Sequence, residues 1–442
     1  MSGSSLRELG LDLVAEEQWE KALGVFAEAV RRQPADHRSR MLAARCYEKL
    51  SEPERAVTTL HACAEGLLRR DYLLSAIAAC KQALVLSPYE KRLKETLHRI
   101  HARAAKTIAG KAAVPPPLPP DSLYDGKTEQ DLMSLQGGEL SDAAINVLAS
   151  PDTGGGADSE ARPPLPLFAD LERDAFVELV SCMAYREVPP GELISGEGQG
   201  GDTIYVIVAG KAEVTRVVDG APKTLAFLGG GSIFGELAML TGAPLTASVT
   251  TVSECDLFEI RRLDLNQIAR SHPSVPQTLT AFAQNRMAKN LMATSPLFQQ
   301  IPEGERPRIL TKFLFKALQP NEKALTEGEH APGLFLVLAG EFVVQKEDPG
   351  GGMVSLGILR EGDIAGEISL LTGLRATATV QATRKTAAAF LDRNGFNDLV
   401  KEFPQVRSFL DGLSQRRLKM IGEALRPAEI LDADELVVES TS

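Results

Sequence analysis

Two stretches decide the fold of the second half of this chain: Phe234-GELAMLTGAPLTAS-Val249 and Ala365-GEISLLTGLRATAT-Val380. Each opens on a Gly-Glu pair, continues through residues that favour one short helical turn, passes a Thr-Gly and ends in a β-type run. Glycine allows the backbone to approach a ligand closely, and amides at a helix start attract anions. A carboxylate beside such amides suits a sugar phosphate, with the amides for the phosphate and the glutamate for a ribose hydroxyl.

The two stretches belong to a longer internal repeat. Pro166-Leu167-Phe168 recurs as Pro296-Leu297-Phe298, and Ile204-YVIVA-Gly210 recurs as Leu334-FLVLA-Gly340. The offset is 130 residues at these landmarks and 131 at the Gly-Glu pairs. Each copy has a helix, many short β-segments broken by glycine, and a closing helix, which predicts a small closed barrel or jelly roll. We therefore expect two such domains, at 166–293 and 294–425.

At these residues the chain resembles the cyclic-nucleotide-binding domain family. The tandem arrangement is similar to the regulatory subunit of protein kinase A, and the single barrel is similar to the catabolite-activator group. In that family the Gly-Glu pair and the following amides bind the cyclic phosphate and the ribose 2′-hydroxyl. The resemblance implies cyclic AMP or cyclic GMP as a ligand, and no tightly bound cofactor. Carried over to this sequence, the implied binding residues are Gly366, Glu367, Ile368 and Ser369, and in the first barrel Gly235, Glu236, Leu237 and Ala238.

The arginine of the family pattern is absent from the first copy and stands one residue early in the second. The family places an arginine directly after the cassette proline, but here Leu245 follows Pro244, with Thr246 next. In the second copy Ala376 takes that position, followed by Thr377, and Arg375 stands one residue early. A slip of one residue in an extended segment turns a side chain to the other face. The turn at 372–374 could shift to compensate.

Losing one charge-assisted contact costs roughly 1.5–3 kcal/mol. The first barrel is therefore expected to bind weakly or not at all, and the second depends on Arg375. A second interpretation stays open for Glu236 and Glu367, as carboxylates that cap the short helix.

Residues 1–111 are expected to be helical throughout. Small residues recur at Ala22 and Ala56, a 34-residue period that resembles the tetratricopeptide repeat. Ala76 follows after only 20 residues, so a third unit is about one helix short. The basic helix expected at 89–111 would cap the stack and present either a solvated face or a patch for an acidic partner.

Residues 112–165 are predicted to be a Pro/Gly-rich linker. Val114-PPPLPP-Asp121 favours polyproline II, and 152–165 is polar and rich in glycine. Short amphipathic helices are expected at 129–135 and 140–149. They are either disordered or fold on a partner or on this protein. An acidic tail is predicted at 426–442.

The composition argues against several classes of function. The net charge of −11 disfavours non-specific nucleic-acid binding. Five cysteines, with no CxxC pair, predict reduced buried thiols and no metal site. The absence of an apolar run of about 20 residues predicts no membrane span and favours a cytoplasmic protein. Abundant Ala, Gly and Arg favour a bacterial origin.

The sequence holds no catalytic motif, so a non-enzyme is expected. The predicted fold is an α+β multidomain chain with tetratricopeptide-like repeats followed by two jelly-roll barrels with flanking helices. The favoured function is a cyclic-nucleotide-responsive adaptor, whose helical head at 1–111 engages an unidentified protein partner. The alternative is a scaffold with degenerate nucleotide sites. A transcription regulator is disfavoured because no helix-turn-helix module follows either barrel, and a close kinase-regulatory subunit because the linker lacks paired arginines. Arg416, Arg417 and Lys419 are expected on an exposed turn of the closing helix.

Overall fold

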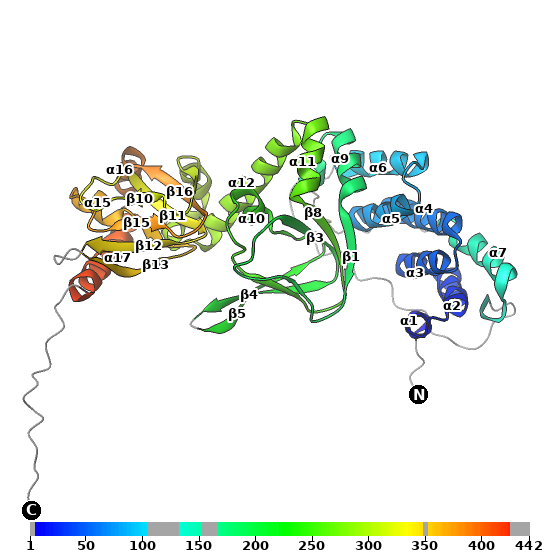
Figure 1. The fold of residues 1–442 in the computed structure, drawn as a ribbon. Coiled ribbons are helices and arrows are strands. Elements are labelled where there is room, and N and C mark those ends of the chain that lie inside the picture. Colours follow the sequence, from blue (N-terminus) through cyan, green and yellow to red (C-terminus); the bar gives the residue numbers. More distant parts are fainter. Residues whose placement is uncertain (1–4, 105–131, 153–165, 219, 348–351, 425–442) are drawn as a thin grey trace, which may run out of the picture. The chain divides into compact units, whose positions relative to one another are not determined.

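The computed structural model describes residues 5–104, 132–152, 166–218, 220–347 and 352–424. It divides into two compact units, one comprising 1–239 and 247–283 and the other comprising 240–246 and 284–442. Figure 1 gives the element labels used below. The expected polyproline segment, the glycine-rich part of the linker, the acidic tail and the end of the basic helix lie outside the described residues.

The N-terminal head is helical, as predicted. Its helices are α1 (Leu6–Ala15), α2 (Trp19–Arg32), α3 (His37–Lys49), α4 (Pro53–Arg69), α5 (Leu73–Leu86) and α6 (Lys91–Ala104). Each packs against the next in sequence. Alanines at the contacts, including Ala22, Ala56 and Ala76, are fully buried and let the helices approach closely.

The irregular spacing of these alanines has a simple origin. Ala22 lies on α2 and Ala56 on α4, two helices later, whereas Ala76 lies on α5, the very next helix. The third unit expected from sequence is therefore the partner helix of α4 followed by α6. The tetratricopeptide assignment itself stays a prediction.

Part of the linker folds onto the head. A 3₁₀ turn, η1 (Leu132–Ser134), and helix α7 (Gly137–Leu148) pack on α2, and α7 also contacts α4. Leu140, Ala144 and Leu148 are buried in this contact. The Tyr47 hydroxyl donates to the Ser141 carbonyl at 3.1 Å. Of the interpretations open from sequence, docking on this protein is the one the structure shows for 132–152.

The first barrel contains two four-stranded antiparallel sheets, ordered β1-β8-β3-β6 and β2-β7-β4-β5. Its strands are β1 (Ala184–Val188), β2 (Leu193–Ser195), β3 (Thr203–Ala209), β4 (Lys211–Val218), β5 (Ala221–Gly229), β6 (Ile233–Phe234), β7 (Ser248–Thr251) and β8 (Cys255–Arg261). The helices are α8 (Pro166–Ala169), α9 (Arg173–Cys182), α10 (Glu236–Thr241), α11 (Arg262–Ser271) and α12 (Val275–Thr294).

The second barrel repeats this topology, with sheets ordered β14-β11-β16-β9 and β10-β15-β12-β13. Its strands are β9 (Leu314–Leu318), β10 (Lys323–Leu325), β11 (Gly333–Ala339), β12 (Phe342–Glu347), β13 (Met353–Leu359), β14 (Ile364–Ala365), β15 (Thr379–Ala382) and β16 (Thr386–Asp392). The helical elements are α13 (Pro296–Gln299), η2 (Glu303–Glu305), α14 (Arg306–Leu310), α15 (Glu367–Thr372), α16 (Arg393–Glu402) and α17 (Pro404–Ala424). The jelly-roll prediction is confirmed.

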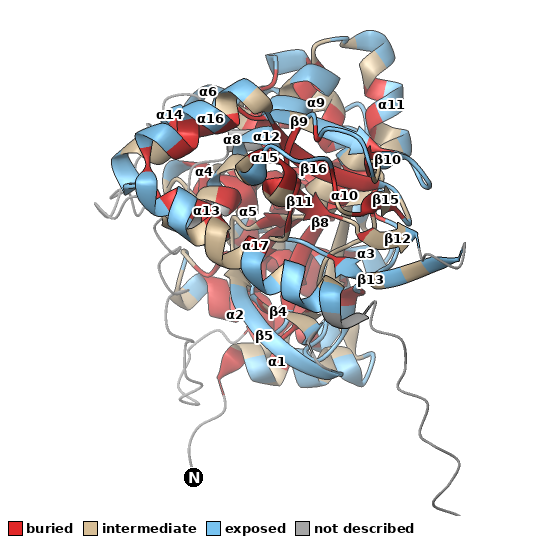
Figure 2. Cartoon of the chain, turned by 90° about the vertical axis from the view of Figure 1, so that its left-hand side faces the viewer, coloured by how far each residue is buried: buried red, intermediate tan, exposed pale blue. Residues whose placement is uncertain are grey.

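Burial follows the strand patterns. The apolar run of β11 is buried along its whole length, and β16 is buried up to its last residue, whereas β5 is largely exposed (Figure 2). Gly340 turns the chain from β11 into β12 at φ 87°, and a Cβ there would lie 2.6 Å from the Lys385 carbonyl oxygen. Only glycine fits such a turn without displacing the backbone.

The head and the first barrel share one apolar core. Buried residues of α2–α6, α7, α9 and β3 form a continuous cluster. Arg38 on α3 donates to Asp256 at 2.9 Å and to Glu254 at 2.8 Å on the first barrel. The Lys81 ammonium on α5 donates to the Ser181 carbonyl at 2.6 Å. The helical head is therefore built into the first barrel and packs as part of it.

The cysteines are all free thiols, and four of the five are buried. Burial raises the pKa of Cys46 and of Cys63 to about 12, so both stay protonated at neutral pH. Within the described residues, no group of His, Cys, Asp or Glu side chains is arranged to hold a metal ion. None of the described helices combines the length and the apolarity needed to cross a bilayer.

Candidate ligand-binding site in the second barrel

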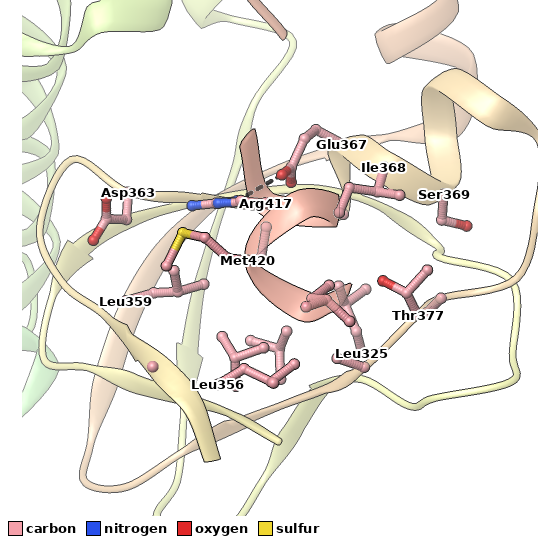
Figure 3. A pocket seen from close by; sticks show the side chains of 18 of the residues that line it. Leu325, Leu356, Leu359, Asp363, Glu367, Ile368, Ser369, Thr377, Arg417 and Met420 are labelled. Carbon is pink, nitrogen blue, oxygen red and sulfur yellow. Dashed lines mark hydrogen bonds and ion pairs between the residues drawn. The ribbon is translucent and has the colours of Figure 1, made fainter. Parts of the chain in front are cut away.

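A cavity of about 280 Å³ opens beside the second cassette. This volume lies near the lower end of the range for small-molecule sites. Its walls come from β10, β12, β13, the cassette and α17 (Figure 3). The residues that line it include Leu325, Leu356, Asp363, Gly366, Glu367, Ile368, Ser369, Ala376, Thr377, Arg417 and Met420.

Gly366 sets the position of the cassette backbone. It precedes α15 with φ 96°, a left-handed conformation, and a Cβ there would lie 2.5 Å from the Gly333 carbonyl oxygen. Any other residue would push α15 away from β11, because backbone atoms cannot yield as a flexible side chain can. The glycine of the motif therefore holds the short helix against the barrel and leaves the cavity side open.

Glu367 is the buried acid of the site. It is 1% exposed, and it lines the cavity at the start of α15. Its carboxylate accepts a hydrogen bond from the Arg417 guanidinium at 2.6 Å, and the same nitrogen also donates to the Ile364 carbonyl. The sequence prediction that Arg417 lies on an exposed turn is wrong, because the turn of α17 aims this side chain inward.

The electrostatics of this pair follow from burial. Burial raises the pKa of the Glu367 carboxyl, and the charge and hydrogen bond of Arg417 act in the opposite direction. The two charges therefore stabilise each other in a place where either alone would be costly. In Figure 3 the two side chains point toward each other across the cavity rim, while Leu325 and Leu356 lie on another wall.

The cassette side chains after Glu367 have mixed roles. Ile368 and Thr377 line the cavity, and Ser369 lines it with its hydroxyl engaged. The Ser369 hydroxyl donates to the Leu374 carbonyl at 2.5 Å and accepts from the Ala331 amide at 3.3 Å. Ser369 therefore ties the cassette turn to the barrel, whereas Thr377 presents a neutral hydroxyl group to the cavity.

Arg375 and Ala376 occupy different faces of the returning segment. Ala376 is 7% exposed and lines the cavity. Its backbone is fixed by two hydrogen bonds, from its amide to the Glu329 carbonyl at 2.7 Å and from the Gly328 amide to its carbonyl at 2.9 Å. Arg375 is exposed, and its guanidinium donates to the Gly328 carbonyl at 2.7 Å. Arg375 is outside the set of residues that line the cavity.

The first cassette keeps the backbone feature of the second. Gly235 has φ 84°, and a Cβ there would lie 2.4 Å from the Thr203 carbonyl oxygen. Glu236 is 8% exposed and Ala238 3% exposed. Leu237, Leu245 and Thr246 are half-buried. Leu245, which follows Pro244, presents an apolar side chain at this point of the first cassette.

Sequence reasoning missed that α17 completes the site. Arg417, Met420 and Ile421 line the cavity from this helix. They share one helical face at spacings of three and four. Arg417 is followed at these spacings by two apolar residues, and this was the one signal that could have marked it as inward-facing.

Two segments of the chain, 185–272 and 315–403, match the family model described as "Cyclic nucleotide-binding domain". They correspond to the two barrels. The duplication inferred from the sequence is thereby matched by two segments similar to this domain.

The relatives are regulators and kinases. The chain is 29% identical over 235 residues to a cAMP-dependent protein kinase regulatory subunit of Yarrowia lipolytica, covering 53% of this chain and 58% of the relative. It is 25% identical over 244 residues to human cGMP-dependent protein kinase 2, covering 55% and 30%. The chain thus spans less than two thirds of these relatives. Because they are eukaryotic, they give no support to the bacterial origin expected from composition.

Among solved structures, the regulatory domain of Toxoplasma gondii PKA with cAMP matches with a TM-score of 0.28 at 24% identity, covering 57% of this chain and 92% of that one. The catabolite activator protein of Thermus thermophilus matches with a TM-score of 0.28 at 29% identity, covering 33% and 67%. From the family match and the relatives together, the chain contains two tandem domains similar to the cyclic-nucleotide-binding domains of kinase regulatory subunits, preceded by a helical region.

Proposed function

We propose that this chain is a regulatory protein, without catalytic activity of its own, in which a ribose-bearing ligand of the nucleotide type binds the second barrel. The observation that carries the proposal is the 2.6 Å pair between Glu367 and Arg417. It joins the cassette carboxylate, which suits a ribose hydroxyl, to the closing helix. The matched family model supports cyclic nucleotides as candidate ligands.

The Glu367–Arg417 pair couples ligand binding in the second barrel to the position of α17. A hydroxyl group that hydrogen-bonds Glu367 changes the partners available to Arg417, and Arg417 sits on α17, which contacts both α15 and β13. A ligand can shift the position of α17 only if it binds two arrangements with different affinity. Competition for the Glu367 oxygens supplies such a difference. In this proposal α17 is the moving element and the barrel is the fixed one.

The output is a change in protein–protein interaction. The relatives named as regulatory subunits support a kinase catalytic subunit as the kind of partner. The absence of paired arginines at 112–165 argues against a substrate-like inhibitory segment there. We therefore propose that the partner is engaged by folded surfaces, with the helical head as the adaptor.

Ligand binding and helix movement can be tested together. The full-length protein is titrated calorimetrically with cyclic AMP, cyclic GMP, a cyclic dinucleotide and the corresponding nucleosides. We expect at least one of them to bind with a Kd below about 1 mM. Amide hydrogen exchange of α17 should change on binding. Arg417→Ala should abolish that change, whereas Arg416→Ala, its exposed neighbour, should not. The absence of binding by every compound would contradict the proposal.

The first barrel favours a second role, as a structural scaffold. Leu245 provides no charge for a phosphate, and the core of this barrel continues into the head. We propose that it supports the head and does not bind a ligand. Glu236→Ala should therefore leave the stoichiometry of binding at one ligand per chain, and loss of a binding event in this variant would contradict the proposal.

A further inference from the structure

The charges around the second cavity select against a phosphate. Within the described part of the barrel, the ionisable residues that line the cavity are Asp363, Glu367 and Arg417. Two carboxylates and one guanidinium give a formal charge of −1. A cyclic phosphate would add another negative charge to a space whose remaining walls are mainly apolar, and low-dielectric surroundings strengthen that repulsion.

Arg417, the cation that lines the cavity, already forms hydrogen bonds within the protein. Arg417 donates to the Glu367 carboxylate at 2.6 Å and to the Ile364 carbonyl at 2.5 Å. If it turned to a phosphate, it would leave Glu367, which is 1% exposed, as a buried carboxylate without its cation. Removing one member of a buried pair is strongly unfavourable. Both bonds use Nη1, and the single positive charge of Arg417 cannot neutralise Glu367 and a phosphate at the same time.

Two other cations beside the cavity are held by protein groups. Lys346 donates to the Glu327 carboxylate at 2.5 Å and to the Thr377 carbonyl at 2.9 Å. Arg375 donates to the Gly328 carbonyl at 2.7 Å. Neither lines the cavity. On this side of the cavity, the segment presents the methyl group of Ala376 and the neutral hydroxyl of Thr377.

What the cavity does offer suits an uncharged ribonucleoside. Glu367 accepts hydrogen bonds and matches a ribose hydroxyl, and the Thr377 hydroxyl is a neutral partner for the sugar edge. Leu325, Leu356 and Met420 provide apolar surface against which a base can pack (Figure 3). From this combination we infer that the second barrel binds an uncharged ribonucleoside in preference to the corresponding 3′,5′-cyclic monophosphate. The inference rests on the proposed function and sharpens its ligand class.

The test compares matched ligands on the full-length protein. Adenosine, guanosine, cytidine and uridine are each titrated beside their 3′,5′-cyclic monophosphates by calorimetry, at one salt concentration. At least one nucleoside should bind about tenfold or more tightly than its cyclic partner. Its 2′-deoxy form should lose about tenfold or more, because Glu367 then lacks a hydroxyl.

Two variants separate the alternatives. Ala376→Arg places a cation on the cavity face and should strengthen cyclic-monophosphate binding about ten- to a hundredfold. Arg375→Ala removes only the exposed arginine and should change the affinity for neither the nucleosides nor the cyclic monophosphates. Thermal unfolding checks that both variants are folded. If Ala376→Arg is not folded, the relative affinities of the wild-type protein for the two ligand classes and the effect of Arg375→Ala still test the inference.

The outcomes distinguish the two levels of the proposal. If a cyclic monophosphate binds wild-type protein as tightly as its nucleoside, or if Arg375→Ala weakens cyclic-monophosphate binding, the nucleoside inference is overturned while the regulatory function stands. If neither the nucleosides nor the cyclic monophosphates bind, both the nucleoside inference and the proposed function fail.

Discussion

At the scale of single residues, the site depends on one buried acid and its cation. Removing Arg417 leaves Glu367 in the barrel wall without its partner. We expect Arg417→Ala to lower the free energy of unfolding of the second barrel by roughly 1–3 kcal/mol, the usual cost of an unsatisfied buried polar group. Urea unfolding at pH 7 measures this loss. Arg416→Ala is the matched control, since Arg416 is exposed, and an equal effect of both variants would contradict the assignment.

The same pair predicts a pH dependence. Because burial raises the pKa of Glu367 above 4.5, the folded state keeps its proton to higher pH than the unfolded state. Stability is therefore lost as the pH rises from 4.5 through the folded pKa, and Arg417 limits that loss. Without Arg417 the folded pKa is higher still. The deficit of Arg417→Ala should be largest at pH 7 and shrink toward pH 4.5, as comparative unfolding at pH 7 and 5 would show. A deficit that grows on acidification would contradict this account.

At the scale of elements, α7 is the segment whose placement most changes the head. Leu140 is 2% exposed where α7 packs on the head. We expect Leu140→Ala to destabilise the head by about 2–5 kcal/mol, because it leaves a cavity in a packed contact. Hydrogen exchange of α7 should accelerate with it. Asn146→Ala, on the exposed face of the same helix, should change stability by less than about 0.5 kcal/mol. Unchanged exchange in Leu140→Ala would show that α7 does not depend on this contact.

At the scale of the whole molecule, the head and the first barrel are expected to unfold together. Arg38 is a polar link between them, with a side chain 15% exposed that bridges Asp256 and Glu254. Arg38→Ala should lower the stability of this unit by roughly 1–3 kcal/mol. Arg45 forms a more exposed pair with Glu187, so Arg45→Ala should cost less than about 1 kcal/mol. Thermal unfolding followed by circular dichroism would separate the two, and equal effects would contradict the assigned role of Arg38.

The sequence alone was enough to predict the barrels, because their determinants are local. The Gly-Glu pair, the short helical turn and the closing β-run each need only neighbouring residues, and the 130-residue repeat shows them twice. The helical head followed from its periodic small residues in the same way. The presence of Leu245 and Ala376, where the resemblance predicts an arginine, was also visible in the sequence.

What the sequence could not decide is which side chains meet across long separations. Glu367 and Arg417 are 50 residues apart, and the neighbours Arg416 and Arg417 look alike in the sequence. Successive residues of a helix point about 100° apart, so only the packing of α17 on the barrel selects the one that turns inward. Likewise, only the fold places Arg375 on the Gly328 carbonyl and Ala376 on the cavity. The sequence determined the barrels and which residues stand in their cassettes. The tertiary structure alone decided which cation lies in the second cavity, because it fixes the rotation of the helix that closes it.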